Sequence, residues 1–292
     1  MNSVRILLTG ASGQLGHELQ RWLAPLGSLV ACTRAECDLE RPEQIREVVR
    51  RVAPDVIVNP AAYTAVDKAE SEPARAEAVN RDAVAILAEE AKGIGATIVH
   101  YSTDYVFNGA KAGRYVEDDA AAPLGVYGRT KWEGEAVLRA SGVPHLILRT
   151  SWVVGTHGGN FARTMLRLAL THETLRVVAD QVGAPTSAAL ISEVTVALLR
   201  RLETDRDAFP SGTYHLAAAG ETSWHGYAQF VFAEVGLDPA RVHPITTAEY
   251  PTAARRPANS RLDTTRLRST LGIELPDWTV GVREVVRALR AQ

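Results

Sequence analysis

The chain has 292 residues, of which 46% are hydrophobic and 23% charged, and these proportions exclude disordered, collagenous and fibrous proteins. The formal charge is −2 without blocks of like charge, so we expect neither a nucleic acid nor a membrane as partner. The two cysteines, Cys32 and Cys37, cannot form a disulfide framework. With no recognisable export or membrane signal, we expect a cytoplasmic protein.

Short apolar runs rich in Val and Ile alternate with amphipathic segments in the first half of the chain. This alternation is typical of βαβ units around a parallel sheet buried on both faces. The predicted strands cover residues 5–9, 29–32, 56–59, 97–102 and 145–149, and the predicted helices lie near 14–24, 42–52, 74–92 and 125–140. We therefore predict an α/β fold in which residues 1–150 form a doubly wound parallel sheet of the Rossmann type.

Beyond residue 150 the alternation becomes less regular. The pattern predicts helices near 160–170, 188–203, 223–235 and 279–290, a strand at 214–216, and loops at 179–185 and 250–261. We predict that residues 151–292 largely form a smaller substrate-binding lobe. The two parts are expected to be interleaved, with elements near 186–217 returning to the first domain.

The first predicted strand is followed by Gly10, Gly13 and Gly16, which precede an amphipathic helix. Glycines permit a tight turn and close backbone approach, so the amides at the helix N-terminus can hold a pyrophosphate. In this strand–turn–helix context the pattern predicts a dinucleotide site rather than an ordinary turn. The G-x-x-G-x-x-G spacing resembles that of the extended short-chain dehydrogenase/reductases, in which it binds NAD(P).

The second predicted strand ends in Thr33-Arg34, without the acidic residue that accepts the ribose 2′-hydroxyl of NAD. An arginine at this position can contact a 2′-phosphate, although it could also be one of the solvated arginines of the chain. We predict that Thr33 and Arg34 contact the cofactor and that NADPH is preferred, with NADH as a second candidate cofactor.

Tyr127 and Lys131 lie four residues apart in the predicted helix near 125–140, so their side chains share one helix face. The chain contains only four lysines against 28 arginines, which makes this pair unusual by chance. A phenol titrates near ~10 in water, and an adjacent ammonium group eases its proton transfer by stabilising the phenolate. We predict that Tyr127 transfers a proton and that Lys131 assists it; the alternative is an exposed helix pair.

Hydroxyl groups follow the fourth predicted strand, in Ser102-Thr103-Asp104, at the sheet edge where ligands of open α/β folds bind. Thr103 can donate a hydrogen bond to a substrate carbonyl there. The glycine turn, these hydroxyls and the Tyr-x-x-x-Lys pair occur in the order that a hydride-transfer site requires. Zinc-protease and G-x-S-x-G motifs are absent from the sequence, which argues against a metal or serine hydrolase.

Longer segments in consistent order extend the comparison to nearly the whole chain. They are AAYTAVDKAE (61–70), STDYVF (102–107), RTSW (149–152), DQVGAPT (180–186), TSW (222–224) and RPANSRL (256–262). On these segments the chain resembles the dTDP-4-dehydrorhamnose reductase family. The resemblance implies NADPH-dependent reduction of the C4 keto group of dTDP-4-dehydro-β-L-rhamnose, the last step of dTDP-L-rhamnose synthesis. Tyr105 stands where related dehydratases carry a glutamate, which disfavours dehydration.

The resemblance also implies roles for individual residues. Tyr127 would be the proton donor, Lys131 would lower its pKa and bind the nicotinamide ribose, and Thr103 would orient the C4 carbonyl. The implied cofactor residues are Gly10, Gly13, Gln14, Leu15, Gly16, Asp38, Leu39, Ala62, Tyr63, Thr64 and Tyr101, and the implied substrate residues are Thr103, Asp104, Tyr127, Trp152, Arg256 and Asn259.

Two other functions stay open at this point. One is a 4-ketoreductase for another dTDP-6-deoxysugar, such as one used in antibiotic glycosylation. The other is a non-catalytic NADP-binding regulatory subunit, against which the intact Tyr127 and Lys131 argue. By the same resemblance, Glu18 is a candidate Mg²⁺ ligand and a homodimer is a candidate assembly, with the other metal ligands unassigned.

Overall fold

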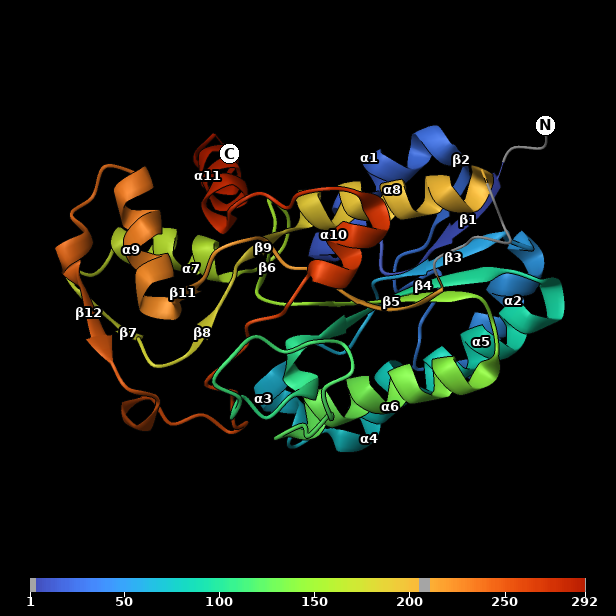
Figure 1. Cartoon of the computed structure of the whole chain (residues 1–292), viewed down its shortest axis with the longest axis horizontal. Coiled ribbons are helices and arrows are strands. Elements are labelled where there is room, and N and C mark those ends of the chain that lie inside the picture. Colours follow the sequence, from blue (N-terminus) through green and yellow to red (C-terminus); the bar gives the residue numbers. More distant parts are fainter. Residues whose placement is uncertain (1–3, 205–210, 292) are drawn as a thin grey trace.

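A parallel six-stranded sheet forms the centre of the computed structural model, which describes residues 4–204 and 211–291 (Figure 1). The strand order is β10-β5-β4-β3-β1-β2, and every neighbouring pair is parallel. The strands are β1 (Val4–Leu8), β2 (Gly27–Ala31), β3 (Val56–Asn59), β4 (Thr97–Thr103), β5 (His145–Thr150) and β10 (Gly212–His215). The predicted doubly wound α/β class is confirmed.

Helices cover both faces of this sheet (Figure 1). On one face α1 (Gln14–Leu23) packs against α8 (Ala188–Thr204). On the other, α5 (Ala83–Ile94) packs between α2 (Pro42–Val52) and α6 (Val126–Ser141). Every residue of β3 and β4 is buried, because helices on both sides exclude water. The strand order changes direction between β1 and β3, so a ligand crevice is expected beyond their carboxyl ends.

The remaining elements lie mostly to one side of the sheet (Figure 1). Three small two-stranded sheets pair β6 (Val153–Val154) with β9 (Thr186–Ser187), β7 (Leu175–Val178) with β12 (Val242–Ile245), and β8 (Val182–Gly183) with β11 (Thr222–Ser223). The helices here are α7 (Phe161–Ala169), α9 (Trp224–Glu234), α10 (Thr265–Leu271) and α11 (Trp278–Arg290). Short 3₁₀ turns cover Ala24–Leu26, Asp104–Val106, Pro239–Arg241 and Thr247–Glu249. In the described ranges 4–204 and 211–291, we find no helix long and apolar enough to span a membrane.

The structure differs from the sequence prediction in several places, and β6, β9, β11 and α10 were not predicted. The predicted helix near 74–92 consists of α4 (Pro73–Glu77), a π-helical turn (Ala78–Asp82) and α5, after the short helix α3 (Val66–Ala69). The predicted loop at 179–185 contains β8, and both β7 and β12 were missed. These short strands pair with partners more than 35 residues away, such as Val182 with Ser223, so local periodicity does not reveal them.

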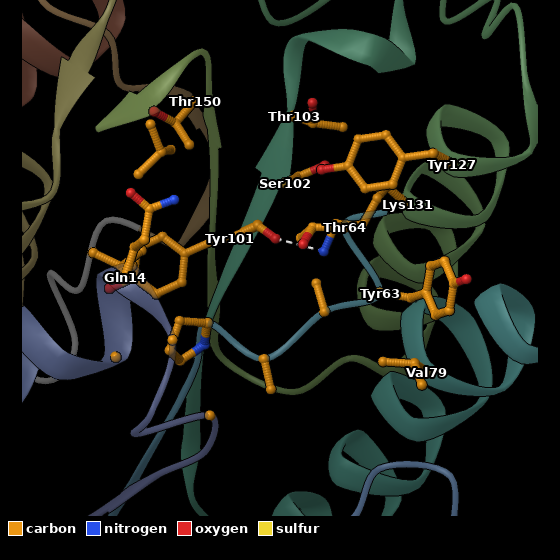
Figure 2. A pocket seen from close by; sticks show the side chains of 18 of the residues that line it. Gln14, Tyr63, Thr64, Val79, Tyr101, Ser102, Thr103, Tyr127, Lys131 and Thr150 are labelled. Atoms are coloured by element: carbon orange, nitrogen blue, oxygen red, sulfur yellow. Dashed lines mark hydrogen bonds between the residues drawn. The ribbon is translucent and has the colours of Figure 1, made fainter. Parts of the chain in front are cut away.

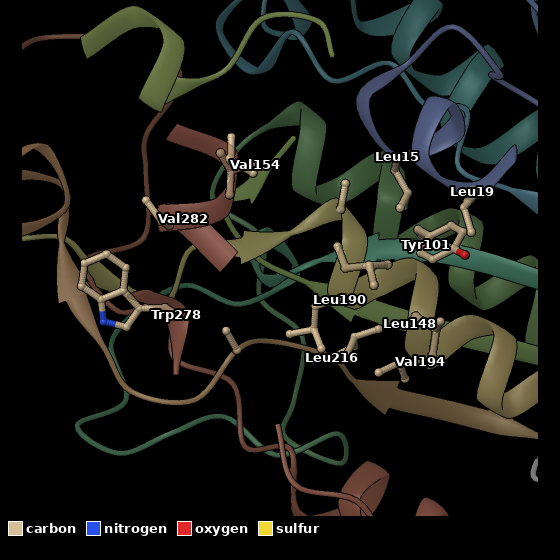
Figure 3. Close-up of a cluster of buried hydrophobic side chains, with 14 of the residues drawn as sticks. Leu15, Leu19, Tyr101, Leu148, Val154, Leu190, Val194, Leu216, Trp278 and Val282 are labelled. Carbon is tan, nitrogen blue, oxygen red and sulfur yellow. The ribbon is translucent and has the colours of Figure 1, made fainter. Parts of the chain in front are cut away.

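Two apolar cores lie on opposite faces of the central sheet. The larger core includes Leu19 of α1, Leu148 of β5 and Val194 of α8, and it extends to Trp278 and Val282 of α11 (Figure 3). The second core lies under α2, α5 and α6. Because the larger core is continuous, burial of apolar surface joins α11 and its neighbours α7, α9 and β9 to the elements on this face of the sheet.

A buried ion pair fixes α6 to the sheet. Arg149 of β5 donates from Nε and Nη2 to the two carboxylate oxygens of Glu135, at 2.9 and 2.7 Å. Glu135 is 0% and Arg149 2% exposed, and Ser102 of β4 donates to the same carboxylate at 2.5 Å. Burial by itself raises the pKa of Glu135, but Arg149 and Ser102 hold it below its ordinary value. The register of α6 on β4 and β5 is therefore set by charge-assisted hydrogen bonds.

Replacing Arg149 by Met leaves the buried Glu135 without its main partner. We expect the free energy of unfolding to fall by about 3–5 kcal/mol, measured by urea denaturation at neutral pH. Arg268→Met is the matched control, because Arg268 pairs with the exposed Glu274 and should cost less than about 1 kcal/mol. Equal, small losses for both variants would contradict this account of α6.

Candidate active site

A cavity of about 510 Å³ lies at the carboxyl ends of β1, β3, β4 and β5 (Figure 2). Most of the residues predicted from the sequence line it. They are Gly10, Gly13, Gln14, Leu15, Gly16, Arg34, Asp38, Leu39, Ala62, Tyr63, Thr64, Tyr101, Thr103, Asp104, Tyr127, Lys131 and Trp152. Side chains from the glycine turn, the third and fourth strands and α6 therefore face one space.

The turn after β1 is shaped so that only glycine fits at two positions. Gly10 has a φ of +59°, and a Cβ there would lie 2.9 Å from Ala61 atoms. A Cβ on Gly16 would lie 2.0 Å from the carbonyl oxygen of Gly10. Gly13 caps α1 without a side-chain hydrogen bond, so the first helix amides remain open to an anion. This turn fits the pyrophosphate of a dinucleotide.

Lys131 is buried beneath the cavity at 2% exposure. Its Nζ donates to the carbonyl oxygen of Tyr101 at 2.7 Å, the dashed contact in Figure 2, and lies 3.2 Å from Nε2 of His100. Burial lowers the pKa of Lys131 to about 8, and Glu135, one helical turn away, opposes this shift. The hydrogen bond to Tyr101 thus positions the ammonium group, while burial makes it easier to deprotonate.

Tyr127 lies on the same face of α6, with its ring near Thr103 (Figure 2). Burial raises the pKa of Tyr127 to about 12, a hydrogen bond with Thr103 lowers it, and the nearby Asp104 raises it. The net shift is upward, so Tyr127 is a protonated phenol at neutral pH. The lowering of its pKa by Lys131 that the resemblance implies stays a prediction.

Two buried oxygens of the cavity wall have no hydrogen-bond partner in the part of the chain that the structure describes: Asp104 Oδ2 and Thr150 Oγ1. Thr103 donates to the other oxygen of Asp104 at 3.1 Å. Burial raises the pKa of Asp104 to about 6, while Ser260 and Thr103 lower it. Because buried polar atoms are normally satisfied, these two atoms point to a polar ligand in the cavity.

Two aromatic rings form part of the cavity wall. The Trp152 and Trp224 rings stack with centroids 3.7 Å apart, and both residues line the cavity. Trp152 has a φ of +48°, which is unusual for a bulky side chain. A Cβ on Gly183 would lie 2.8 Å from the Trp152 ring, so this indole is clamped between Gly183 and Trp224. Such a wall suits an apolar sugar face.

Comparison with known proteins agrees with this geometry. The family model described as RmlD substrate binding domain matches residues 4–291. A dTDP-4-dehydrorhamnose reductase of Burkholderia thailandensis is 48% identical and covers 99% of this chain and 100% of its own. That of Escherichia coli K12 is 47% identical over 98% of each chain. The crystal structure of the Bacillus anthracis dTDP-4-dehydrorhamnose reductase in complex with NADP superposes with a TM-score of 0.90, at 34% identity over 98% and 99% of the chains.

The chain belongs to the dTDP-4-dehydrorhamnose reductase family. The resemblance read from six segments of the sequence is therefore confirmed.

Four residues predicted for this reductase site lie outside the cavity lining. Thr33 donates its amide and hydroxyl groups to Glu36. Asn259 is buried and uses its amide to hold the carbonyl oxygens of residues 111 and 113 and the Arg261 side chain. These contacts give both residues a local structural role.

The other two predicted residues also have protein partners. Arg256 pairs with Asp67 at 2.7 Å. The Arg256 charge is also close enough to Tyr105, which lines the cavity, to lower the pKa of that phenol. Glu18 accepts hydrogen bonds from Arg21 and Trp22. Within residues 4–204 and 211–291, no group of three His, Cys, Asp or Glu side chains could hold a metal ion. Glu18 therefore has no companion metal ligands in the described part of the chain.

The sequence analysis also missed cavity residues: Ser12, Cys37, Glu40, Pro60, Ala61, Val66, Val79, Ser102, Tyr105, Thr150, Ser151, Val153 and Trp224. Two further residues act from behind the wall. His100 contacts Lys131, and Asn80 in the π-helical turn bonds both backbone groups of Tyr63 and the Thr130 hydroxyl. A histidine inside an apolar strand and an asparagine inside a helix were the available signals, since buried polar side chains need partners.

We expect His100→Leu to lower the pKa of Lys131 below about 8. The neutral tautomer of His100 whose Nε2 carries no proton accepts a hydrogen bond from the ammonium form and stabilises it, and leucine cannot. Lysine side-chain NMR titration measures this shift, with only four lysines to resolve and Lys131→Met to assign the signal. His100→Gln, which keeps an acceptor, should lower it less, and His243→Leu on the exposed face of β12 should not change it. An unchanged Lys131 pKa in His100→Leu would show that His100 does not hold the ammonium group.

Proposed function

We propose that this chain reduces the C4 keto group of dTDP-4-dehydro-β-L-rhamnose to give dTDP-β-L-rhamnose, using NADPH. The observation that carries the proposal is one cavity that joins a glycine turn shaped for a pyrophosphate to the Tyr127–Thr103–Lys131 group. Membership of the chain in the dTDP-4-dehydrorhamnose reductase family indicates the substrate class.

The glycine turn, with Gln14 and Leu15 at the start of α1, would hold the pyrophosphate, and Lys131 would hold the nicotinamide ribose. When bound, the reduced nicotinamide supplies the hydride. The B. anthracis relative is described with NADP, which supports the same cofactor here. Residues 1–150 would thus serve mainly the cofactor and residues 151–292 mainly the sugar nucleotide.

Tyr127 would donate the proton to the C4 oxygen as negative charge develops there. Its pKa of about 12 keeps the phenol protonated. Thr103 beside it would turn its hydroxyl from Asp104 Oδ1 to donate a second hydrogen bond to the same oxygen. The positive charge of Lys131 would stabilise the phenolate left behind. These donors are fixed by α6 and β4 before substrate arrives, so little reorganisation accompanies the reaction.

On the substrate side, Asp104 Oδ2 would accept a hydrogen bond from a sugar hydroxyl, and Trp152 would pack against the apolar face of the ring. Arg256, beside Tyr105 at the edge of the cavity, would contact the nucleotide diphosphate by exchanging its bond to Asp67. Asp104 Oδ2 has no hydrogen-bond partner among the described residues, which is consistent with such a hydroxyl partner.

Tyr127→Phe removes the proton donor while keeping the ring. We expect kcat to fall by roughly 10²-fold or more, with the dissociation constant of NADPH nearly unchanged, because the phenol acts mainly on the transition state. Steady-state kinetics and a binding titration measure the two quantities. Tyr214→Phe on β10, outside the cavity lining, is the control. Equal loss of cofactor binding and turnover would contradict the role of Tyr127.

The pH dependence of kcat/KM should be bell-shaped. Ionised Asp104 accepts a hydrogen bond from a sugar hydroxyl more strongly than the protonated carboxyl does, so activity should rise as pH increases through about 6. Lys131 must be protonated, so activity should fall as pH increases through about 8. Asp104→Asn should remove the acid limb and leave the alkaline limb. A profile that stays flat to about pH 9.5 would contradict the role of the Lys131 charge.

The proposed function is tested by following NADPH absorbance with enzymatically generated dTDP-4-dehydro-L-rhamnose and identifying the product sugar. Oxidation that depends on substrate and yields dTDP-L-rhamnose supports the proposal. Oxidation only with another dTDP-4-keto-6-deoxysugar indicates a different ketoreductase. NADPH binding without turnover of any such sugar indicates a regulatory subunit.

A further inference from the structure

Two arginines from different parts of the chain converge on one carboxylate at the edge of the cavity. Arg34, which follows β2, donates from Nη2 to Glu40. Arg75 of α4 donates from Nε to both carboxylate oxygens of Glu40, at 3.0 and 2.9 Å. Arg34 and Glu40 both line the cavity. The Glu40 carboxylate thus sits between two guanidinium groups as a built-in anion.

This cluster lies at the end of the cavity opposite Tyr127 and Lys131. Those two residues face the carboxyl end of β4, whereas Arg34 follows β2, the outermost strand of the sheet beyond β1. In dinucleotide folds, the residue after the second strand meets the 2′ position of the adenosine ribose: an acid accepts the hydroxyl of NAD, and an arginine accommodates the phosphate of NADP. Here an acid and an arginine share that position.

The charges of the cluster cancel. Asp38 Oδ1 lies 3.5 Å from Nε of Arg34, so Arg34 and Arg75 face the two carboxylates of Asp38 and Glu40. A phosphate dianion placed here is attracted by the guanidinium groups but repelled by the carboxylates. A ribose hydroxyl has no charge to be repelled and can donate to Glu40. The Glu40 side chain is only 26% exposed, so solvent screens it incompletely.

We infer that Glu40 is a specificity residue that sets the choice between NADPH and NADH in this chain. It holds Arg34 and Arg75 at the cavity edge, yet it occupies the donors that a 2′-phosphate needs. Removing its charge frees Nη2 of Arg34 and Nε of Arg75 for phosphate oxygens. The inference rests on the proposed use of a nicotinamide dinucleotide, but not on the identity of the sugar.

Isothermal titration calorimetry of the full chain with NADP⁺ and with NAD⁺, without sugar, tests this assignment. In Glu40→Gln the ratio of the dissociation constants, NAD⁺ over NADP⁺, should rise about fivefold or more, the effect of one unit charge about 4 Å away in a water-like medium. Glu40→Ser, which also removes the charge, should shift the ratio in the same direction. Adding Arg75→Gln to Glu40→Gln should return the ratio toward its original value.

Glu43→Gln is the matched control, because it makes the same charge change in the first turn of α2 on an exposed residue outside the cavity lining. It should leave the ratio unchanged. A ratio that also stays constant in Glu40→Gln and Glu40→Ser would overturn the inference, while binding of both nucleotides would leave the proposed function standing. If neither nucleotide binds the unaltered chain, the proposed function itself fails.

Discussion

The buried pair between Glu135 of α6 and Arg149 of β5 is the contact on which the geometry of the site depends. Tyr127, Lys131 and Glu135 are spaced four residues apart, so they follow one another along a single face of α6. Anchoring Glu135 to two strands fixes the rotation and height of this face above the sheet. A small rotation of α6 would move Tyr127 away from Thr103 and Lys131 away from the Tyr101 carbonyl. The pair therefore links the stability of the fold to the alignment of the reacting groups.

Burial of the Lys131 ammonium group costs stability, whereas the Glu135–Arg149 pair contributes to it. The lowered pKa of Lys131 means that the folded chain holds this proton less tightly than an exposed lysine does. The carbonyl oxygen of Tyr101 compensates in part by accepting a hydrogen bond, and Nε2 of His100 lies 3.2 Å from the same ammonium group. Burying this positive charge beneath the cavity therefore reduces the stability of the folded chain. Charged groups with shifted pKa values are common at active sites.

The sequence contained enough information to predict the central sheet and most of the cavity. The glycine turn, the Tyr127–Lys131 spacing and the polar end of β4 are short-range patterns whose meaning depends only on the element that carries them. His100, Asn80 and Trp224 could not be assigned, because their roles come from contacts with residues 17 to 72 positions away. Arg34 lines the cavity as predicted, but the link through Glu40 to Arg75 joins residues 35 positions apart and so could not be predicted from local pattern. Asn259 lies in a segment that matches the family and was predicted to bind substrate, yet its amide donates to the carbonyl oxygens of residues 111 and 113.

The central claim is that this cavity brings the C4 atom of a dTDP-keto-sugar to a nicotinamide and to the Tyr127 hydroxyl. The most direct measurement uses NADPH deuterated at the transferring position of C4, dTDP-4-dehydro-β-L-rhamnose and proton NMR of the product. The account predicts one deuterium at C4 of dTDP-β-L-rhamnose and none at C3 or C5. A product without deuterium at C4, or with another configuration at that carbon, would contradict it.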